Sequence, residues 1–415
     1  MTKINYLRKC VNEKYEEKDL AGAVEVGEVL LREHWHNRSM WTTGYANDLF
    51  NLACVHEELG NLERAAALYS DSAAQISVAE GERLPFAERI NNLAMVLIRM
   101  GMPEPAFFML GNATSIRRRE LGAHNPLYAD SLYNLANAAA EAGRRGDSIR
   151  YHLEALKIRK NEGHTEDIIN SLHSIAFIHE SAQEYEKAAT YAESAMKFSA
   201  GDDTAFAGAC NYLAGLYENC KRYEPAINLY DQVLEIAQCE VGQKNGSYLN
   251  VALRRASLLA VLNRNSEALA AHTEICEIFA DMLGTHHIFY ANCLRGMALI
   301  HKNMGEPILA EETILDVMKI RRTLNEDITT DIIFLIRLHL SDNQPEKALD
   351  ALIYALMCSG ADTPEFAQLL NMLVEAFTTQ TETTGEFIDA MELLNDREKL
   401  RPILRKWEAW ERGDT

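Results

Sequence analysis

The sequence is poor in basic residues. Its 415 residues contain 41 Lys and Arg against 61 Asp and Glu, which gives a formal net charge of −20 at pH 7. A surface this negative repels phosphates, so nucleic acid is not expected as a partner. The chain also lacks an apolar run of about 18 residues, the minimum for a membrane-spanning helix, and its first residues are too polar for a signal peptide. We therefore expect a cytoplasmic protein that makes no membrane contact.

Motifs for catalysis and metal binding are missing as well. The eight cysteines include no CxxC pair, which favours reduced, mostly buried thiols over a disulfide framework or a zinc site. No GxxxxGK[ST], GxSxG or HExxH motif occurs, and the stretch His56-Glu57-Glu58-Leu59-Gly60 lacks the second histidine of the last. We expect a protein that is not an enzyme and that uses no cofactor or metal.

Linkers rich in proline or glycine are also absent, although a chain of this length would ordinarily hold about three domains. Short turns recur instead, with glycine at some positions and without it at others: Lys18, Gly60, Gly101, Gly143, Gln183, Lys221, Asn263, Gly305 and Asn343. The gaps between successive turns are 42, 41, 42, 40, 38, 42, 42 and 38 residues. A regular period of this size is typical of helical solenoids.

Small residues flank each turn at fixed distances. Seven residues before the turn stand Ala53, Ala94, Ala136, Ala176, Ala214, Ala256 and Ala298. Five residues after it stand Ala65, Ala106, Ser148, Ala188, Ala226, Ala268, Ala310 and Ala348. Small side chains at these points let two helices cross closely, and apolar residues around the first alanine recur at helical spacing. Each unit therefore predicts a helix A, a tight turn and a helix B, and stacking of the units makes one continuous core.

Two stretches carry a family resemblance. Residues 121–136 and 283–294, both beginning with Leu-Gly, resemble the long tetratricopeptide repeats of kinesin light chains, and the resemblance covers approximately residues 6–358. It implies an all-α fold, a right-handed α-α superhelix of about eight to nine helix-turn-helix units with helical caps. It also implies a concave groove, lined by helices A, that binds protein segments. The chain departs from the pattern at Arg255 and in the turns without glycine.

The ends differ from the middle of the chain. Residues 1–40 indicate an N-terminal cap or incomplete first repeat, residues 41–360 the solenoid, and residues 361–415 a C-terminal helical cap. Capping is the default role of such ends, because a solenoid must cover its last apolar faces. Trp407 and Trp410 are spaced i, i+3, and an alternative is that they dock a partner or a second copy of the chain.

The helix-A positions that face the groove follow from the core stripe. If the alanine stripe is core, the opposite stripe lies thirteen, nine, six and two residues before each turn. The candidate groove residues on this basis are Asn47, Asn51, Glu88, Asn92, Asp130, Asn134, Asn137, Asn170, Phe177, Tyr212, Asn250, Arg254 and Asn292. Asparagine is a mediocre helix former, so its recurrence here requires a reason. One hypothesis is that the amides bind the main chain of an extended peptide; the other is that they bond neighbouring helices and hold the stack in register.

Charged and aromatic residues refine the expected ligand. Glu88, Asp130 and Glu141 favour a basic segment in the N-terminal half of the groove, whereas Arg254 adds the opposite charge further along. Phe177 and Tyr212 are candidate apolar anchors. The basic clusters near Arg117, Arg159 and Arg321 fall at the C-terminal ends of helices B, where cations favour the helix dipole, and we interpret them as solvated ends.

These features favour a non-enzymatic scaffold that binds a protein or peptide ligand in an asparagine-lined groove. The alternative is a peptide-responsive regulatory receptor, which changes conformation and target affinity when a signalling peptide binds.

Overall fold

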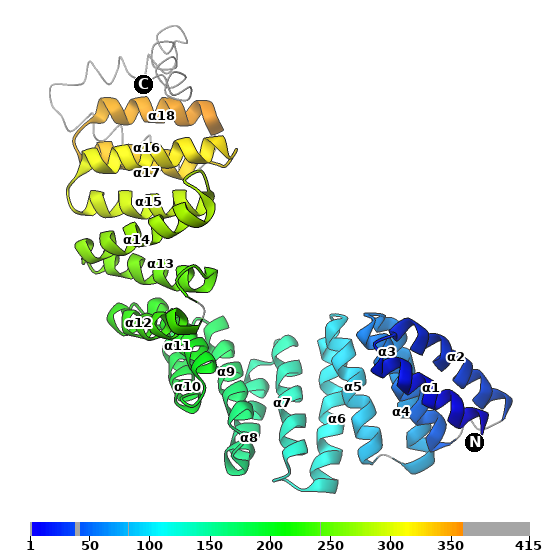
Figure 1. Cartoon of the computed structure of the whole chain (residues 1–415). Helices are drawn as coiled ribbons and strands as arrows, with labels where there is room; N and C mark the ends of the chain where they lie inside the picture. The colour runs from blue at the N-terminus through cyan, green and yellow to red at the C-terminus, as the bar shows by residue number, and fades with distance from the viewer. Residues whose placement is uncertain (1, 38–41, 82, 241, 360–415) are drawn as a thin grey trace. The chain divides into compact units, whose positions relative to one another are not determined.

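The structure is a computed structural model that describes residues 2–37, 42–81, 83–240 and 242–359. These residues form helices and turns, and contain no β-strand (Figure 1). The helices are α1 (Lys3–Glu16), α2 (Leu20–His36), α3 (Thr43–Glu58), α4 (Leu62–Glu80), α5 (Leu84–Arg99), α6 (Pro103–Leu121), α7 (Pro126–Glu141), α8 (Arg145–Glu162), α9 (Thr165–Ser181), α10 (Tyr185–Phe198), α11 (Asp203–Asn219), α12 (Tyr223–Glu240), α13 (Gly246–Val261), α14 (Asn265–Leu283), α15 (Ile288–Asn303), α16 (Pro307–Thr323), α17 (Thr329–Ser341) and α18 (Pro345–Ser359).

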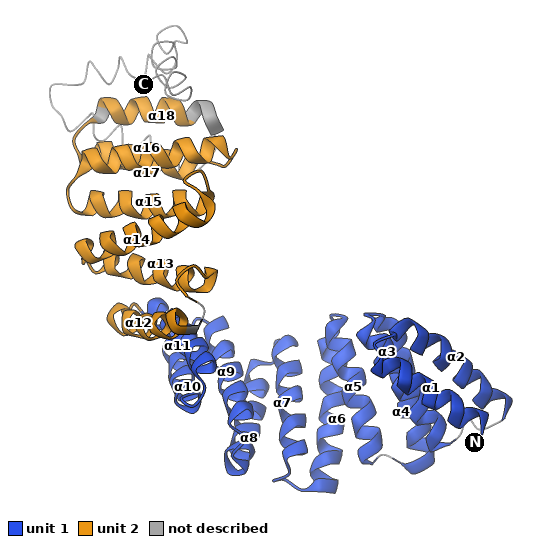
Figure 2. Ribbon diagram, viewed as in Figure 1, with its two compact units in different colours: residues 1–220 blue, residues 221–415 orange. Residues whose placement is uncertain are grey.

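The chain divides into two compact units, residues 1–220 and residues 221–415 (Figure 2). In the first unit each helix from α1 to α11 packs against the next, and in the second unit the same holds from α12 to α18. Within each unit, odd-numbered helices A alternate with even-numbered helices B. This arrangement confirms the all-α solenoid; the right-handed superhelical path stays a prediction.

The turn register is confirmed at every position. All nine turn residues have a positive φ, including Lys18 at 61°, Gln183 at 58° and Lys221 at 59°. The amide after the turn donates to the carbonyl four residues before it, as from Asn61 to His56 (2.9 Å). Glycine adopts this left-handed conformation without steric cost, whereas other residues lose about 1–2 kcal/mol in it. The units without glycine therefore keep the turn geometry at some expense of stability.

Both alanine positions are buried in the packing of the helices. Every small residue at these positions, from Ala53 to Ala298 before the turns and from Ala65 to Ala348 after them, is fully buried. One apolar cluster joins Leu49 and Leu52 of α3 to Leu93 of α5 and Leu135 of α7. The core of the first unit is thus shared between successive helix pairs, as stacking of the units requires.

The first helix pair is fixed to the second by a buried carboxylate. Asp48 of α3 accepts two hydrogen bonds from the Arg8 guanidinium of α1 (2.6 and 2.7 Å), and lies 2.7 Å from His34 Nε2 of α2. The hydrogen bond to Asp48 raises the pKa of Arg8. Residues 1–40 therefore include a paired α1 and α2, while the predicted C-terminal cap, with Trp407 and Trp410, lies outside the described residues.

Candidate functional site: the helix-A face

The structure places all thirteen candidate groove residues on helices A, on the stripe opposite the buried alanines. We call this stripe the helix-A face. The side chains of Asn47, Asn51, Glu88, Asn170, Phe177, Asn250 and Asn292 are exposed, and those of Asn92, Asp130, Asn134, Asn137, Tyr212 and Arg254 are partly buried. Ten of these residues belong to the first unit, whereas Asn250, Arg254 and Asn292 belong to the second.

Two of the asparagines join neighbouring helices. Asn134 of α7 donates to Asn91 Oδ1 of α5 (3.2 Å), and Asn91 donates in turn to Asn92 Oδ1 (3.3 Å). Asn91 is buried and was not among the candidates, because it lies one residue off the predicted stripe. Asn51 is exposed, and its amide makes no hydrogen bond with another described residue. The amides of Asn92 and Asn134 therefore bond within the stack, while the Asn51 amide is available to a ligand.

Long arginine side chains donate hydrogen bonds to asparagines of neighbouring helices on the helix-A face. Arg89 of α5 donates to Asn47 Oδ1 of α3 and to Ser72 Oγ of α4 (3.1 Å). Arg321 Nη2 of α16 donates to Asn292 Oδ1 of α15 (2.7 Å). Asn47 and Asn292 thus already accept a hydrogen bond from a cation.

Arg159 shows why one interpretation of the basic clusters is wrong. This last-turn residue of α8 is only 6% exposed. Its guanidinium donates to Ser171 Oγ (2.8 Å), to the Asp167 carbonyl (3.1 Å) and to Asp130 Oδ1 (2.9 Å).

Arg117 behaves similarly, since it donates to Ser131 Oγ of α7 (2.6 Å), and Arg321 pairs with the buried Asp331 of α17 (3.0 Å). These three arginines are not solvated helix ends. The end of each helix B packs against the next helix A, and an arginine there is long enough to reach that helix's buried polar groups.

The arginine contacts change the charge of the helix-A face. The Asp130 carboxylate is compensated by Arg159, and Glu88 lies 3.6 Å from Arg89. Glu141, at the end of α7, is exposed and forms no ion pair with another described residue. Of the three acidic residues considered from the sequence, Glu141 is the one whose charge is least compensated.

Phe177 and Glu141 come together at a cavity of about 300 Å³ between the α7–α8 turn and the end of α9. Phe177 is 64% exposed, and Ala140, Gly143 and Ser181 line the same cavity. Arg145 also lines it, but its guanidinium forms an ion pair with Glu184 (2.5 Å). The cavity therefore combines an apolar ring with an uncompensated carboxylate.

Tyr212 is less available than its sequence position suggested. Its hydroxyl donates to Glu180 Oε2 of α9 (2.8 Å), and its ring packs edge-on against His173 (5.6 Å between centroids). Burial, together with this hydrogen bond, raises the pKa of Tyr212. In the second unit, the Arg254 guanidinium lies over the Tyr230 ring (5.3 Å to the centroid). Both side chains have partners within their own unit.

Six of the described histidines are buried in the packing of the helices. His56 and His179, four residues before their turns, are buried, and His179 Nδ1 lies 2.8 Å from Glu184 Oε2. His34 contacts Asp48, as described above. No group of three or more His, Cys, Asp or Glu side chains among the described residues is placed to hold a metal ion. No described helix is long and apolar enough to cross a membrane.

Comparison with known proteins identifies the repeats. Two tetratricopeptide repeat profiles match the chain, over residues 86–161 and over residues 206–243. A comparison with curated proteins finds no match.

Among solved structures, the chain is similar to kinesin light chain repeats from Podospora anserina, with 18% identity, a TM-score of 0.44, and coverage of 48% of this chain and 99% of that one. It is also similar to a tetratricopeptide repeat protein from Parabacteroides merdae, with 19% identity, a TM-score of 0.43, and coverage of 69% and 98%. A third similarity is to the apo form of RapI, with 15% identity, a TM-score of 0.44, and coverage of 68% and 99%. These identities and scores carry no inference about ligands. The two profile matches, on a chain in which the same turn and alanine positions recur, identify it as a tetratricopeptide repeat protein.

Proposed function

We propose that this protein is a non-enzymatic interaction module that binds an extended segment of a partner protein on the helix-A face of the first unit. Tetratricopeptide repeats generally mediate protein–protein interactions, and a solenoid presents an extended surface suited to a peptide. The observation that supports the proposal most is the cavity beside Phe177, because it places an exposed aromatic ring next to Glu141, a carboxylate without an ion pair among the described residues.

The chemistry of the face indicates the kind of segment. An aliphatic or aromatic ligand side chain would pack on Phe177, and a Lys or Arg next to it would meet Glu141. The Asn51 amide offers donors and an acceptor to a peptide main chain, further along the same face. The ligand is thus an extended segment with an apolar anchor and a basic neighbour.

Single substitutions test the proposal. We expect Phe177→Ala, Glu141→Gln and Asn51→Ala each to weaken capture of the native partner from host lysate. The peptide segment identified in that partner is then measured for direct binding, and each variant should weaken this binding as well. Hot-spot truncation of the aromatic anchor should have the largest effect, a loss of about 2 kcal/mol or roughly thirtyfold in affinity. Val78→Ala is the matched control, because Val78 is 71% exposed on helix B α4.

Two results separate the alternatives. Undiminished capture by both Phe177→Ala and Asn51→Ala would overturn the helix-A site. If the identified peptide instead compacts the protein in X-ray scattering and changes its affinity for a second protein, the peptide-responsive receptor is the correct description.

A further inference from the structure

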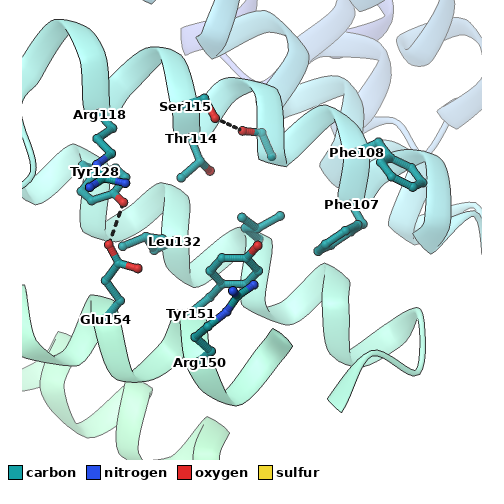
Figure 3. Close-up of a pocket in the computed structure, with 12 residues that line it drawn as sticks. Phe107, Phe108, Thr114, Ser115, Arg118, Tyr128, Leu132, Arg150, Tyr151 and Glu154 are labelled. Carbon is teal, nitrogen blue, oxygen red and sulfur yellow. Dashed lines mark hydrogen bonds between the residues drawn. The ribbon is translucent and has the colours of Figure 1, made fainter. Parts of the chain in front are cut away.

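A second cavity, of about 530 Å³, lies between helices α6 and α8 of the first unit (Figure 3). It is distinct from the helix-A face, because most of its lining residues come from two helices B. Leu132 and Leu135 of α7, both buried, also line it, and together with Phe107 and Tyr151 they form its apolar part. Phe108, on the same stretch of α6, is 66% exposed.

Gly111 opens this cavity. It lies in the middle of α6, where glycine costs about 1 kcal/mol of helix stability relative to alanine. A Cβ at this position would meet no atom within 4 Å, so packing does not demand glycine. Ten residues after the turn, where Gly111 stands, every other unit has a side chain, for example Ser70, Leu153 and Thr273. The missing side chain therefore gives this unit a space that the fold itself does not require.

The cavity holds one arginine without an ion pair among the described residues, Arg118, on a chain of net charge −20. Arg118 and Arg150 line it, while its one carboxylate, Glu154, accepts a hydrogen bond from the Tyr128 hydroxyl (2.8 Å). Arg150 lies over the Tyr151 ring (4.6 Å to the centroid) and pairs with Asp147 (2.8 Å). The Arg118 side chain is exposed and forms no ion pair with another described residue.

The two ends of the cavity differ. Phe107 and Tyr151 lie at one end and Arg118 at the other (Figure 3). Phe107 and Arg118 are eleven residues apart on one helix, which is about 16 Å at 1.5 Å per residue. That length corresponds to about five residues of extended peptide. A segment of a protein spans it, whereas a small metabolite would fill one end.

We propose that this cavity binds an acidic segment of a partner protein, with an aromatic or leucine side chain packed against the Tyr151 ring over Gly111. A carboxylate a few residues along the segment pairs with Arg118. The site is independent of the helix-A site, since it takes an acidic segment instead of a basic one and its lining shares no residue with the cavity beside Phe177.

The test uses a defined peptide, acetyl-Leu-Phe-Ser-Ser-Glu-Glu-amide, and the full chain with methyl-labelled leucines. The NMR signals of the Leu132 and Leu135 methyl groups then report whether the cavity is occupied. The peptide should shift both methyl signals with millimolar affinity. Its Gln-Gln counterpart should bind about fivefold more weakly, because an exposed ion pair contributes up to about 1 kcal/mol. A counterpart with Ala-Ala in place of Leu-Phe should not bind.

Protein variants locate the site. Gly111→Leu should fill the cavity and abolish the shifts, and Arg118→Gln should remove the preference for the acidic peptide. Gly111→Ala is the matched control: it should raise the melting temperature and still bind, because a methyl group occupies little of the space. Phe177→Ala, on the helix-A face, should bind as the wild type does.

Three outcomes would overturn the proposal: no shift of the Leu132 and Leu135 methyl signals with the acidic peptide, equal affinity for the Gln-Gln peptide, or unchanged binding by folded Gly111→Leu. Each of these outcomes leaves the proposed function on the helix-A face intact, since that function is tested with variants of Phe177, Glu141 and Asn51.

Discussion

The hydrogen bond between Asn134 and Asn91 predicts a measurable coupling energy between these two asparagines. A neutral hydrogen bond contributes about 1 kcal/mol net, and replacing Asn by Ala inside a helix returns about 0.5 kcal/mol of propensity. Asn134→Ala loses one hydrogen bond and should lower the free energy of unfolding by about 0.5 kcal/mol. Asn91→Ala loses its bonds to Asn134 and Asn92 (3.2 and 3.3 Å) and should cost about 1.5 kcal/mol.

The double variant loses the shared bond only once. It should be destabilised by about 1 kcal/mol, which leaves a coupling energy of about 1 kcal/mol between the two asparagines. The assay is equilibrium urea unfolding of the four proteins under one condition, with Asn51→Ala as control. Asn51→Ala should stabilise slightly, by about 0.5 kcal/mol, because its exposed amide has no bond to lose. A coupling energy below about 0.3 kcal/mol, within the error of additivity, would refute the stacking role of Asn134.

Three further predictions concern stability. Gln183→Gly should raise the melting temperature, since it relieves a φ of 58° that costs other residues about 1 kcal/mol, and Gln183→Ala should not. Ala136→Leu, at a fully buried position, should destabilise by about 1–3 kcal/mol in urea unfolding, whereas Ala67→Leu at an exposed site of α4 should be neutral. Burial, with Arg159 nearby, lowers the pKa of His152 from 6.5 to about 4, so its contribution to stability is lost as the pH falls through this window; His152→Leu should unfold with a weaker pH dependence between pH 7 and 4.5, and an unchanged pH dependence would contradict the buried neutral state.

The fold could be predicted from the sequence because its determinants are local. A left-handed turn residue, an alanine seven positions before it and a small residue five positions after it can all be read within one unit. Even the turns without glycine, at Gln183 and Lys221, were found from the spacing, and both have positive φ. The repeat period therefore predicts the position of a turn even where the turn residue is not glycine.

The site could be predicted only in part, because long side chains and packing between units decide it. Spacing placed Asp130 on the helix-A face but could not show that Arg159, on the following helix, reaches its carboxylate (2.9 Å). Helix ends are usually solvated, and nothing in the sequence marks an arginine whose long side chain reaches across to the neighbouring helix. The meeting of Phe177 with Glu141 likewise depends on how α9 packs on the α7–α8 turn. Gly111 was the one accessible signal of the second cavity: a glycine at a mid-helix position that is occupied by a side chain in every other unit.

The two proposed sites take segments of opposite charge, and the helix-pair architecture separates them. Each pair exposes one stripe on helix A and another on helix B, so a substitution such as Phe177→Ala or Gly111→Leu alters one surface and leaves the other. The charges of Glu141 and Arg118 lie at the solvent boundary, where screening acts within about 8 Å at physiological salt. They should therefore set which segments approach each surface and how fast, whereas burial of the apolar anchors at Phe177 and Tyr151 should set how long a bound segment stays. Raising the salt concentration should weaken discrimination between acidic and basic segments well before it removes binding to either surface.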